Sequence, residues 1–143
     1  MAERTATTSW DGDLAHGNGV VTGASGALGE LPVTWASRTE RSDGKTSPEE
    51  LIAAAHSSCF SMALAHGLTE AGNPPEHLDV TAKVTLDMKD GAPTVTSSEL
   101  TVSGRVAGID QAAFERAATD AGKNCPISRA LSSLDITVNA TLQ

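Results

Sequence analysis

The sequence predicts an α+β fold, in which antiparallel sheets pack on a long, buried central helix and on a second helix. The long apolar segment within residues 47–72 carries a helix-start signature, and strand patterns lie on both sides of it. Helical patterns then return before a closing strand near the end of the chain. Elements that are grouped by type in this way are typical of α+β proteins.

A chain of 143 residues is expected to form one domain. We divide it into strands and an arginine-containing loop over residues 1–46, the central helix with Cys59 over 47–72, and strands and helices with Cys125 over 78–143. The first part contains short strand patterns separated by turn glycines. Their spacing does not match a dinucleotide-binding loop, and no Lys-Ser or Lys-Thr pair follows them.

The central helix has a well-defined start. Ser47 fits the N-cap, Pro48 fits the first helical position, and Glu50 completes a capping box. The following residues, 51–68, are mostly aliphatic, which predicts a buried helix. At about 100° per residue, Cys59 shares a face with other side chains of this helix and is flanked on both sides: Ile52, Ala55, Ala63 and His66 share the face, and His56 and Met62 flank it.

The segment after the central helix predicts two strands, two helices and a final strand. Alternating apolar residues between 80 and 106 indicate a strand pair with a turn at 89–93. Asp110 fits the N-cap of a helix that ends at Gly122. We expect Asn124 to cap a third, short helix, with Cys125 in its first turn, where the free N–H groups stabilise a thiolate.

Composition excludes several classes of function. The formal net charge of -8 argues against nucleic acid or an anionic membrane as a partner, because both attract basic surfaces. The first residues show no secretory signal, and residues 51–68 contain two histidines and several serines. We therefore expect a cytoplasmic protein with no membrane association, in which thiols stay reduced.

Two cysteines are the candidate reactive groups. A lone cysteine on an apolar helix is usually a small core residue, and apolar surroundings raise a thiol pKa. A second cysteine that begins another helix suggests instead a reversible dithiol/disulfide couple. If Cys59 reacts, a cation has to come to it from elsewhere in the fold. Glu49 could hold such a cation, Arg38 or Arg41, by a bidentate ion pair.

The residues around both cysteines resemble a known family. Residues 47–64, SPEELIAAAHSSCFSMAL, closely resemble the core motif of the OsmC/Ohr peroxidases, on the osmotically inducible branch. Residues 124–128, NCPIS, are similar to that family's second cysteine motif. The segments 10–12 and 108–110 also resemble the family, so that the similarity covers nearly the whole chain.

This resemblance implies an intertwined homodimer with both active sites at the subunit interface. It implies an enzyme of the oxidative stress response that reduces organic hydroperoxides to alcohols, and hydrogen peroxide less well. Cys59 would be the peroxidatic cysteine and Cys125 the resolving one. Glu49 would position the catalytic arginine, with Arg38 the better candidate and Arg41 the alternative. No cofactor is implied beyond the two redox-active cysteines, which an external dithiol of the lipoyl or thioredoxin type would reduce.

The remaining candidates concern the substrate. Ile52, His56, Phe60 and Met62 are expected to surround the organic part of the hydroperoxide. Packing is the simpler interpretation for Phe60 and Met62, and a hydrogen-bonded core or interface residue is the simpler one for His56. We expect no metal site, because no tight ligand pairs accompany Cys59. The alternatives are a non-catalytic dimeric protein that binds a small apolar ligand, and a cysteine redox sensor.

Overall fold

A computed structural model describes all 143 residues of the chain. It contains two compact units, Met1–Leu51 and Ile52–Gln143, which are described separately below. The helix that starts at the end of the first unit continues into the second.

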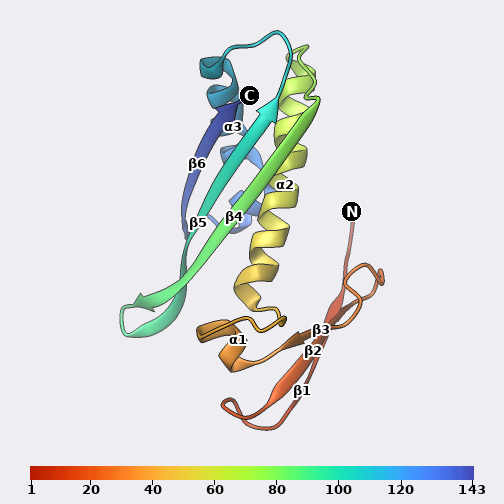
Figure 1. The fold of residues 1–143 in the computed structure, drawn as a ribbon, viewed down its shortest axis with the longest axis vertical. Helices are drawn as coiled ribbons and strands as arrows, with labels where there is room; N and C mark the ends of the chain where they lie inside the picture. Colours follow the sequence, from red (N-terminus) through yellow and green to blue (C-terminus); the bar gives the residue numbers. More distant parts are fainter. The chain divides into compact units, whose positions relative to one another are not determined.

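The first unit is a three-stranded antiparallel sheet followed by a short helix (Figure 1). Its strands pair in sequence order: β1 (Ala6–Asp11), β2 (Asn18–Gly23) and β3 (Leu31–Val33). Helix α1 (Trp35–Thr39) then overlaps the end of a predicted strand and the start of the predicted arginine-containing loop, so those predictions are wrong there. The helix forms because Thr34 and Ser37 make a reciprocal capping box, in which each side chain accepts from the other residue's backbone N–H.

Helix α2 (Pro48–Glu70) begins where the sequence predicts it. The backbone N–H of Glu50 donates to Oγ of Ser47 at 3.1 Å, which is half of the predicted capping box. The other half is absent, because the Glu50 carboxylate accepts instead from the hydroxyl of Thr46 at 2.7 Å. Glu49 and Glu50 both lie in the first turn, where the helix dipole favours negative charge.

The expectation that α2 is a buried helix is wrong for much of its surface in a single chain. Beyond its first turn, where Glu49 is buried, its buried side chains form one stripe at every fourth position: His56, Phe60, Leu64 and Leu68. In the most apolar 18-residue window, only 22% of the residues are buried. By length and composition alone α2 could cross a membrane, but core helices of soluble proteins meet the same criterion. The packed stripe favours the core interpretation.

The second unit contains a three-stranded sheet in the order β4 (His77–Lys89), β5 (Ala92–Arg105) and β6 (Asp135–Leu142). The first two strands form the predicted hairpin, and its tip places Asp90 and Gly91 at φ 51° and 79°. β6 pairs with β5 in parallel, so the expectation of purely antiparallel sheets is wrong for this pair. A parallel pair requires a crossover connection, which helices α3 (Gln111–Asn124) and α4 (Pro126–Ala130) supply here.

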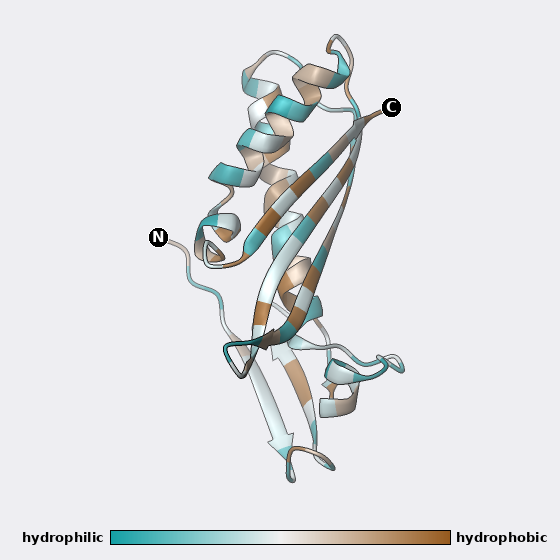
Figure 2. Cartoon of the chain, turned by 90° about the vertical axis from the view of Figure 1, so that its left-hand side faces the viewer, coloured by the Kyte–Doolittle hydropathy of each residue, from teal (hydrophilic) through white to brown (hydrophobic).

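The core of the second unit lies between this sheet and helices α2 and α3. Apolar and polar residues alternate along the strands, as the brown and pale bands of Figure 2 show, so that one face of the sheet packs on the helices. Phe60, Leu64, Leu100 and Phe114 have no exposed surface. Gly122 lies inside α3 and does not end it, contrary to our prediction. A Cβ there would lie 2.7 Å from Cγ2 of Val138, so close packing explains why this position is a glycine.

Candidate functional site

The two cysteines meet in the second unit. Cys59 lies half-buried in the middle of α2, and Cys125 lies fully buried between α3 and α4. Both thiols are free, and they lie close enough for each to shift the pKa of the other. The fold therefore brings together the pair that we predicted to form a redox couple.

The backbone around Cys125 explains how its sulfur is held. Cys125 is at once the C-cap of α3 and the N-cap of α4, so it lies just before the first turn in which we expected it. Its N–H donates to the carbonyl of Ala121 at 2.9 Å, and its carbonyl accepts from Arg129 at 3.0 Å. Pro126 begins α4, and the backbone N–H groups of Ile127 and Ser128 in its first turn act to lower the pKa of Cys125, although the Cys125 side chain makes no capping hydrogen bond. The predicted capping role of Asn124 is wrong, because Asn124 is the last residue of α3.

The surroundings shift the pKa values of the two thiols in opposite directions. Burial raises the pKa of Cys59, and its hydrogen bond with Cys125 raises it further, although the backbone N–H of Ile127 acts against this. Burial also disfavours the thiolate of Cys125. Hydrogen bonds from Cys59 and from the N–H and hydroxyl of Ser128 outweigh burial, however, so the pKa of Cys125 lies below its ordinary value.

The predicted ion pair of Glu49 lies in the first unit and involves Arg38. Nη2 of Arg38 donates to Oε1 of Glu49 at 2.8 Å, and Nε lies 3.1 and 3.2 Å from the two carboxylate oxygens. Glu49 is buried and Arg38 is half-buried, which makes this a shielded, bidentate contact. The side chain of Arg41 is 84% exposed and lies 3.8 Å from Asp43, so the structure favours Arg38 over Arg41 as the partner of Glu49.

Sequence reasoning missed Trp35, which packs on the same arginine. The guanidinium carbon of Arg38 lies 6.0 Å from the centroid of the Trp35 ring, at the outer limit of a cation–π contact. The two residues are three apart in α1, the spacing at which side chains meet on a helix. The signal was therefore present in the sequence, but it is visible only once the short helix is recognised.

The four residues expected to contact the substrate lie in different environments. Phe60 has no exposed surface and packs in the core, as its simpler interpretation predicted. His56 is also fully buried, and its two ring nitrogens are hydrogen-bonded to Ser98 and Ser128. Ile52 is half-buried and Met62 is 72% exposed. Substrate contact stays a prediction for all four, and a substrate could reach Phe60 or His56 only by displacing their neighbours.

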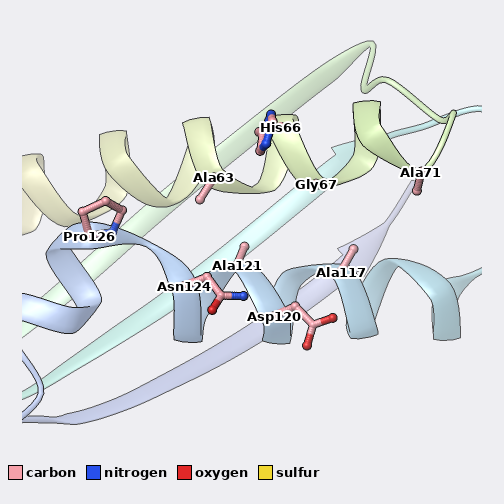
Figure 3. A pocket seen from close by; sticks show the side chains of 9 residues that line it. All are labelled: Ala63, His66, Gly67, Ala71, Ala117, Asp120, Ala121, Asn124 and Pro126. Carbon is pink, nitrogen blue, oxygen red and sulfur yellow. The ribbon is translucent and has the colours of Figure 1, made fainter.

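A cavity of about 520 Å³ lies between α2 and α3 and was not expected from the sequence. Figure 3 shows the small side chains of Ala63, Ala117 and Ala121 in the space between the two helices. The cavity also borders polar groups and the residue next to Cys125: His66, Asp120, Asn124 and Pro126. None of the predicted site residues lines it. No group of three or more His, Cys, Asp or Glu side chains is arranged to hold a metal ion.

The comparisons with known proteins agree with this arrangement. Residues 41–140 match the model of the family described as OsmC-like protein. The chain belongs to the OsmC family. This OsmC-family chain is 41% identical over 134 residues to the proteins called Peroxiredoxin OsmC from Escherichia coli K12 and Shigella flexneri. Each match covers 94% of this chain and 92% of the relative.

Solved structures confirm the α+β fold of the OsmC family for this chain. The organic hydroperoxide resistance protein OhrB of Bacillus subtilis matches with a TM-score of 0.73 at 23% identity, covering 96% of this chain and 98% of OhrB. An organic hydroperoxide resistance protein from Elizabethkingia anophelis gives a TM-score of 0.76 at 23% identity, and the match covers 100% of this chain and 98% of that protein. An OsmC-like protein of unknown function from Vibrio cholerae gives a TM-score of 0.77 at 16% identity, and the match covers 99% of this chain and 100% of that protein. At these identities the likeness concerns the fold.

Proposed function

We propose that this protein is a cysteine-dependent peroxidase that reduces organic hydroperoxides, and hydrogen peroxide less well. The observation that carries the proposal is the pair of free thiols, Cys59 and Cys125, which lie close enough for each to shift the pKa of the other. With a hydroperoxide as the oxidant, such a pair can pass through a sulfenic acid to a disulfide. The relatives at 41% identity, which are called Peroxiredoxin OsmC, support the same chemistry.

The reaction has three steps. The Cys59 thiolate attacks one peroxide oxygen, the O–O bond breaks, and the alkoxide leaves as an alcohol after taking a proton, so that Cys59 becomes a sulfenic acid. Cys125 then attacks the Cys59 sulfur; an S–S bond forms as the S–O bond breaks, and hydroxide leaves as water after taking a proton. An external dithiol of the lipoyl or thioredoxin type reduces the disulfide and is itself oxidised.

We assign Arg38 and Glu49 to the first step. The pKa of Cys59 is raised by burial and by Cys125, and no cation is among the groups that shift it, so a reactive thiolate requires a positive charge from elsewhere. The Arg38 guanidinium, fixed by Glu49, is the cation that we propose for this role. It would also donate to the peroxide oxygens and stabilise the leaving alkoxide.

The exposed surface of the chain supports a homodimer. Helix α2 is apolar, yet most of it is not buried, and Met62 on it is 72% exposed. Every residue of strand β1 is exposed, including the apolar ring of Trp10. Exposed apolar surface of this kind marks an interaction site, and a second copy of this chain is the partner that we propose.

Free thiols also fit the cytoplasm, where we place the protein.

The test measures how fast the reduced protein consumes peroxide. Stopped-flow spectroscopy monitors the reaction, with cumene hydroperoxide and with hydrogen peroxide as substrates. Cys59→Ser should abolish consumption, whereas Ser58→Ala, an exposed serine beside it, should leave it unchanged. Cys125→Ser should allow one turnover and leave a sulfenic acid at Cys59, detectable by mass spectrometry. Full activity of Cys59→Ser would refute the proposal. Disulfide formation without repeated turnover under any dithiol would favour a redox sensor instead.

A further inference from the structure

The two cysteines differ in how a molecule from solution can reach them. Cys125 has no exposed surface, whereas Cys59 is half-buried. On the same side of α2, Ala55 and Met62 lie about one turn before and after Cys59, and both are exposed. One sulfur of the pair is therefore open to small molecules, and the other is closed.

Cys125 is also fixed in its place near α2. Its backbone N–H donates to the carbonyl of Ala121 at 2.9 Å, and its carbonyl accepts from the N–H of Arg129 at 3.0 Å. It joins α3 directly to α4, with no loop of its own that could swing the sulfur into solvent. Pro126, the next residue, lines the same cavity as Ala63, which lies one turn beyond the peroxidatic cysteine on α2 (Figure 3). A thiolate released here stays beside its former partner.

A partner chain on α2 would not reverse this difference. Cys125 is closed by its own chain, and a second copy can only cover more surface. The proposed reaction, by contrast, requires that a hydroperoxide reach the Cys59 sulfur in the working protein. The opening that admits a hydroperoxide also admits a small thiol, because both carry their reacting atom at the end of a small organic group. The inference below rests on the proposed function, in which the two cysteines form a disulfide.

We propose that the external reductant attacks the Cys59 sulfur of this disulfide, that Cys125 is the leaving group, and that the released Cys125 makes the protein select dithiols over monothiols. A reductant thiolate forms an S–S bond with Cys59 as the Cys59–Cys125 bond breaks, and Cys125 leaves as a thiolate. The second thiol of a dithiol then attacks the reductant sulfur bound to Cys59. The reductant leaves as a disulfide, oxidised by two electrons, and Cys59 takes up the proton of that second thiol.

The released Cys125 both speeds the first step and blocks monothiols. Its surroundings hold the pKa of Cys125 below its ordinary value, and a thiol of lower pKa leaves a disulfide faster. A monothiol brings no second thiol, so another molecule has to compete with the neighbouring Cys125, which reforms the disulfide and expels the first monothiol. A dithiol escapes this competition because its second thiol also attacks intramolecularly.

The first test locates the attacked sulfur. The disulfide is formed in the wild-type protein with diamide, exposed briefly to β-mercaptoethanol, quenched in acid and mapped by mass spectrometry. In the folded protein, β-mercaptoethanol should be bound to Cys59, with Cys125 as a free thiol. In guanidinium chloride, where both sulfur atoms are exposed, both cysteines should carry it, and this is the matched control. β-Mercaptoethanol on Cys125 of the folded protein, or no disulfide with diamide, would overturn the proposal.

The second test measures the selection by the rate of complete reduction. Doubling β-mercaptoethanol should raise this rate about fourfold in the wild-type disulfide, because two molecules are needed before Cys125 returns. In Cys125→Ser, loaded at Cys59 with β-mercaptoethanol as a mixed disulfide, the same doubling should raise it only about twofold. Doubling dithiothreitol should give about twofold in both proteins. A twofold response of the wild type to β-mercaptoethanol would refute the selection.

Neither test uses peroxide, so the outcomes can be told apart from those of the proposed function. A protein that fails these tests but consumes hydroperoxide through Cys59 leaves the peroxidase proposal standing. A protein that passes them but consumes no hydroperoxide refutes the peroxidase and leaves the order of thiol exchange standing.

Discussion

His56 should make the stability of the protein depend on pH in a window that follows from its burial. Burial lowers its pKa from the ordinary value of 6.5, whereas the unfolded chain takes up a proton near that value. Below pH 6.5 the unfolded state therefore binds more protons than the folded state. The free energy of unfolding consequently falls as the pH drops through 6.5, and it stops falling once the folded-state pKa is passed.

The size of this loss can be estimated from linkage. One proton contributes about 1.4 kcal/mol per pH unit between the unfolded and folded pKa values. Lowering the pH from well above 6.5 to 5.5 should then cost up to about 1.4 kcal/mol, a sizeable part of the roughly 5–15 kcal/mol that stabilises an ordinary domain. Above pH 7.5 the contribution of His56 should be flat, because the ring is neutral in both states.

The assay is urea unfolding followed by circular dichroism at pH 7.5, 6.5 and 5.5, at one fixed protein concentration. Below pH 6.5 the free energy of unfolding should fall more steeply with pH in the wild type than in His56→Gln. Carboxylates titrate in both proteins, so their effect cancels in the difference. His66→Gln removes an exposed histidine from the same helix and should follow the wild type. If His56→Gln does not fold, proton NMR of wild-type His56 replaces it. A ring that protonates with a midpoint at or above 6.5 would refute the reasoning.

Three further predictions concern the arginine, the core and the dimer. Arg38→Ala should slow the reaction of Cys59 with hydroperoxide by roughly ten- to a hundredfold, the equivalent of one charged hydrogen bond. Arg41→Ala should leave the rate unchanged. Equal losses of rate in the two variants, measured by stopped flow, would contradict this prediction. Gly122→Ala should lower the free energy of unfolding by about 1–3 kcal/mol, because the new Cβ meets Val138. Gly67→Ala, with nothing within 4 Å, should be neutral or stabilising in the same urea assay. Met62→Lys should shift a sedimenting dimer toward monomer, while Thr69→Lys, also exposed on α2, should not; a Met62→Lys protein that remains dimeric would exclude this surface from the interface.

Features that depend on neighbouring residues could be predicted from the sequence. The start of α2 follows from Ser47, Pro48 and the two glutamates, and the strands of the second unit follow from alternating apolar residues. The ion pair of Glu49 was predictable as a type of contact, because a carboxylate in the first turn of a helix lay close in sequence to two arginines. Choosing Arg38 over Arg41 required the fold, because Arg38 lies on helix α1 and contacts Glu49 from there, whereas Arg41 follows the end of that helix.

Features that depend on distant parts of the chain could not be predicted in this way. The direction of β6 depends on where α3 and α4 lead the chain, which no strand pattern encodes. Gly122 matches a helix stop by composition, but it lies inside α3, and it is a glycine because Val138, on another element, leaves no room for a side chain. The partners of His56 lie 42 and 72 residues away, so nothing near His56 indicates them.

The opposite pKa shifts of the two thiols fit the different roles that we propose for them. Residues 52–143 hold both sulfur atoms, and the groups there favour the negative charge on Cys125 rather than on Cys59. A resolving thiol needs this state continuously, because it has to attack as soon as a sulfenic acid forms. In the proposed reaction, a peroxidatic thiol needs its charge only when a hydroperoxide is present, and we propose that the Arg38–Glu49 pair supplies it. The reactivity of Cys59 should therefore depend on this pair, while the lowered pKa of Cys125 depends on the residues around its own sulfur.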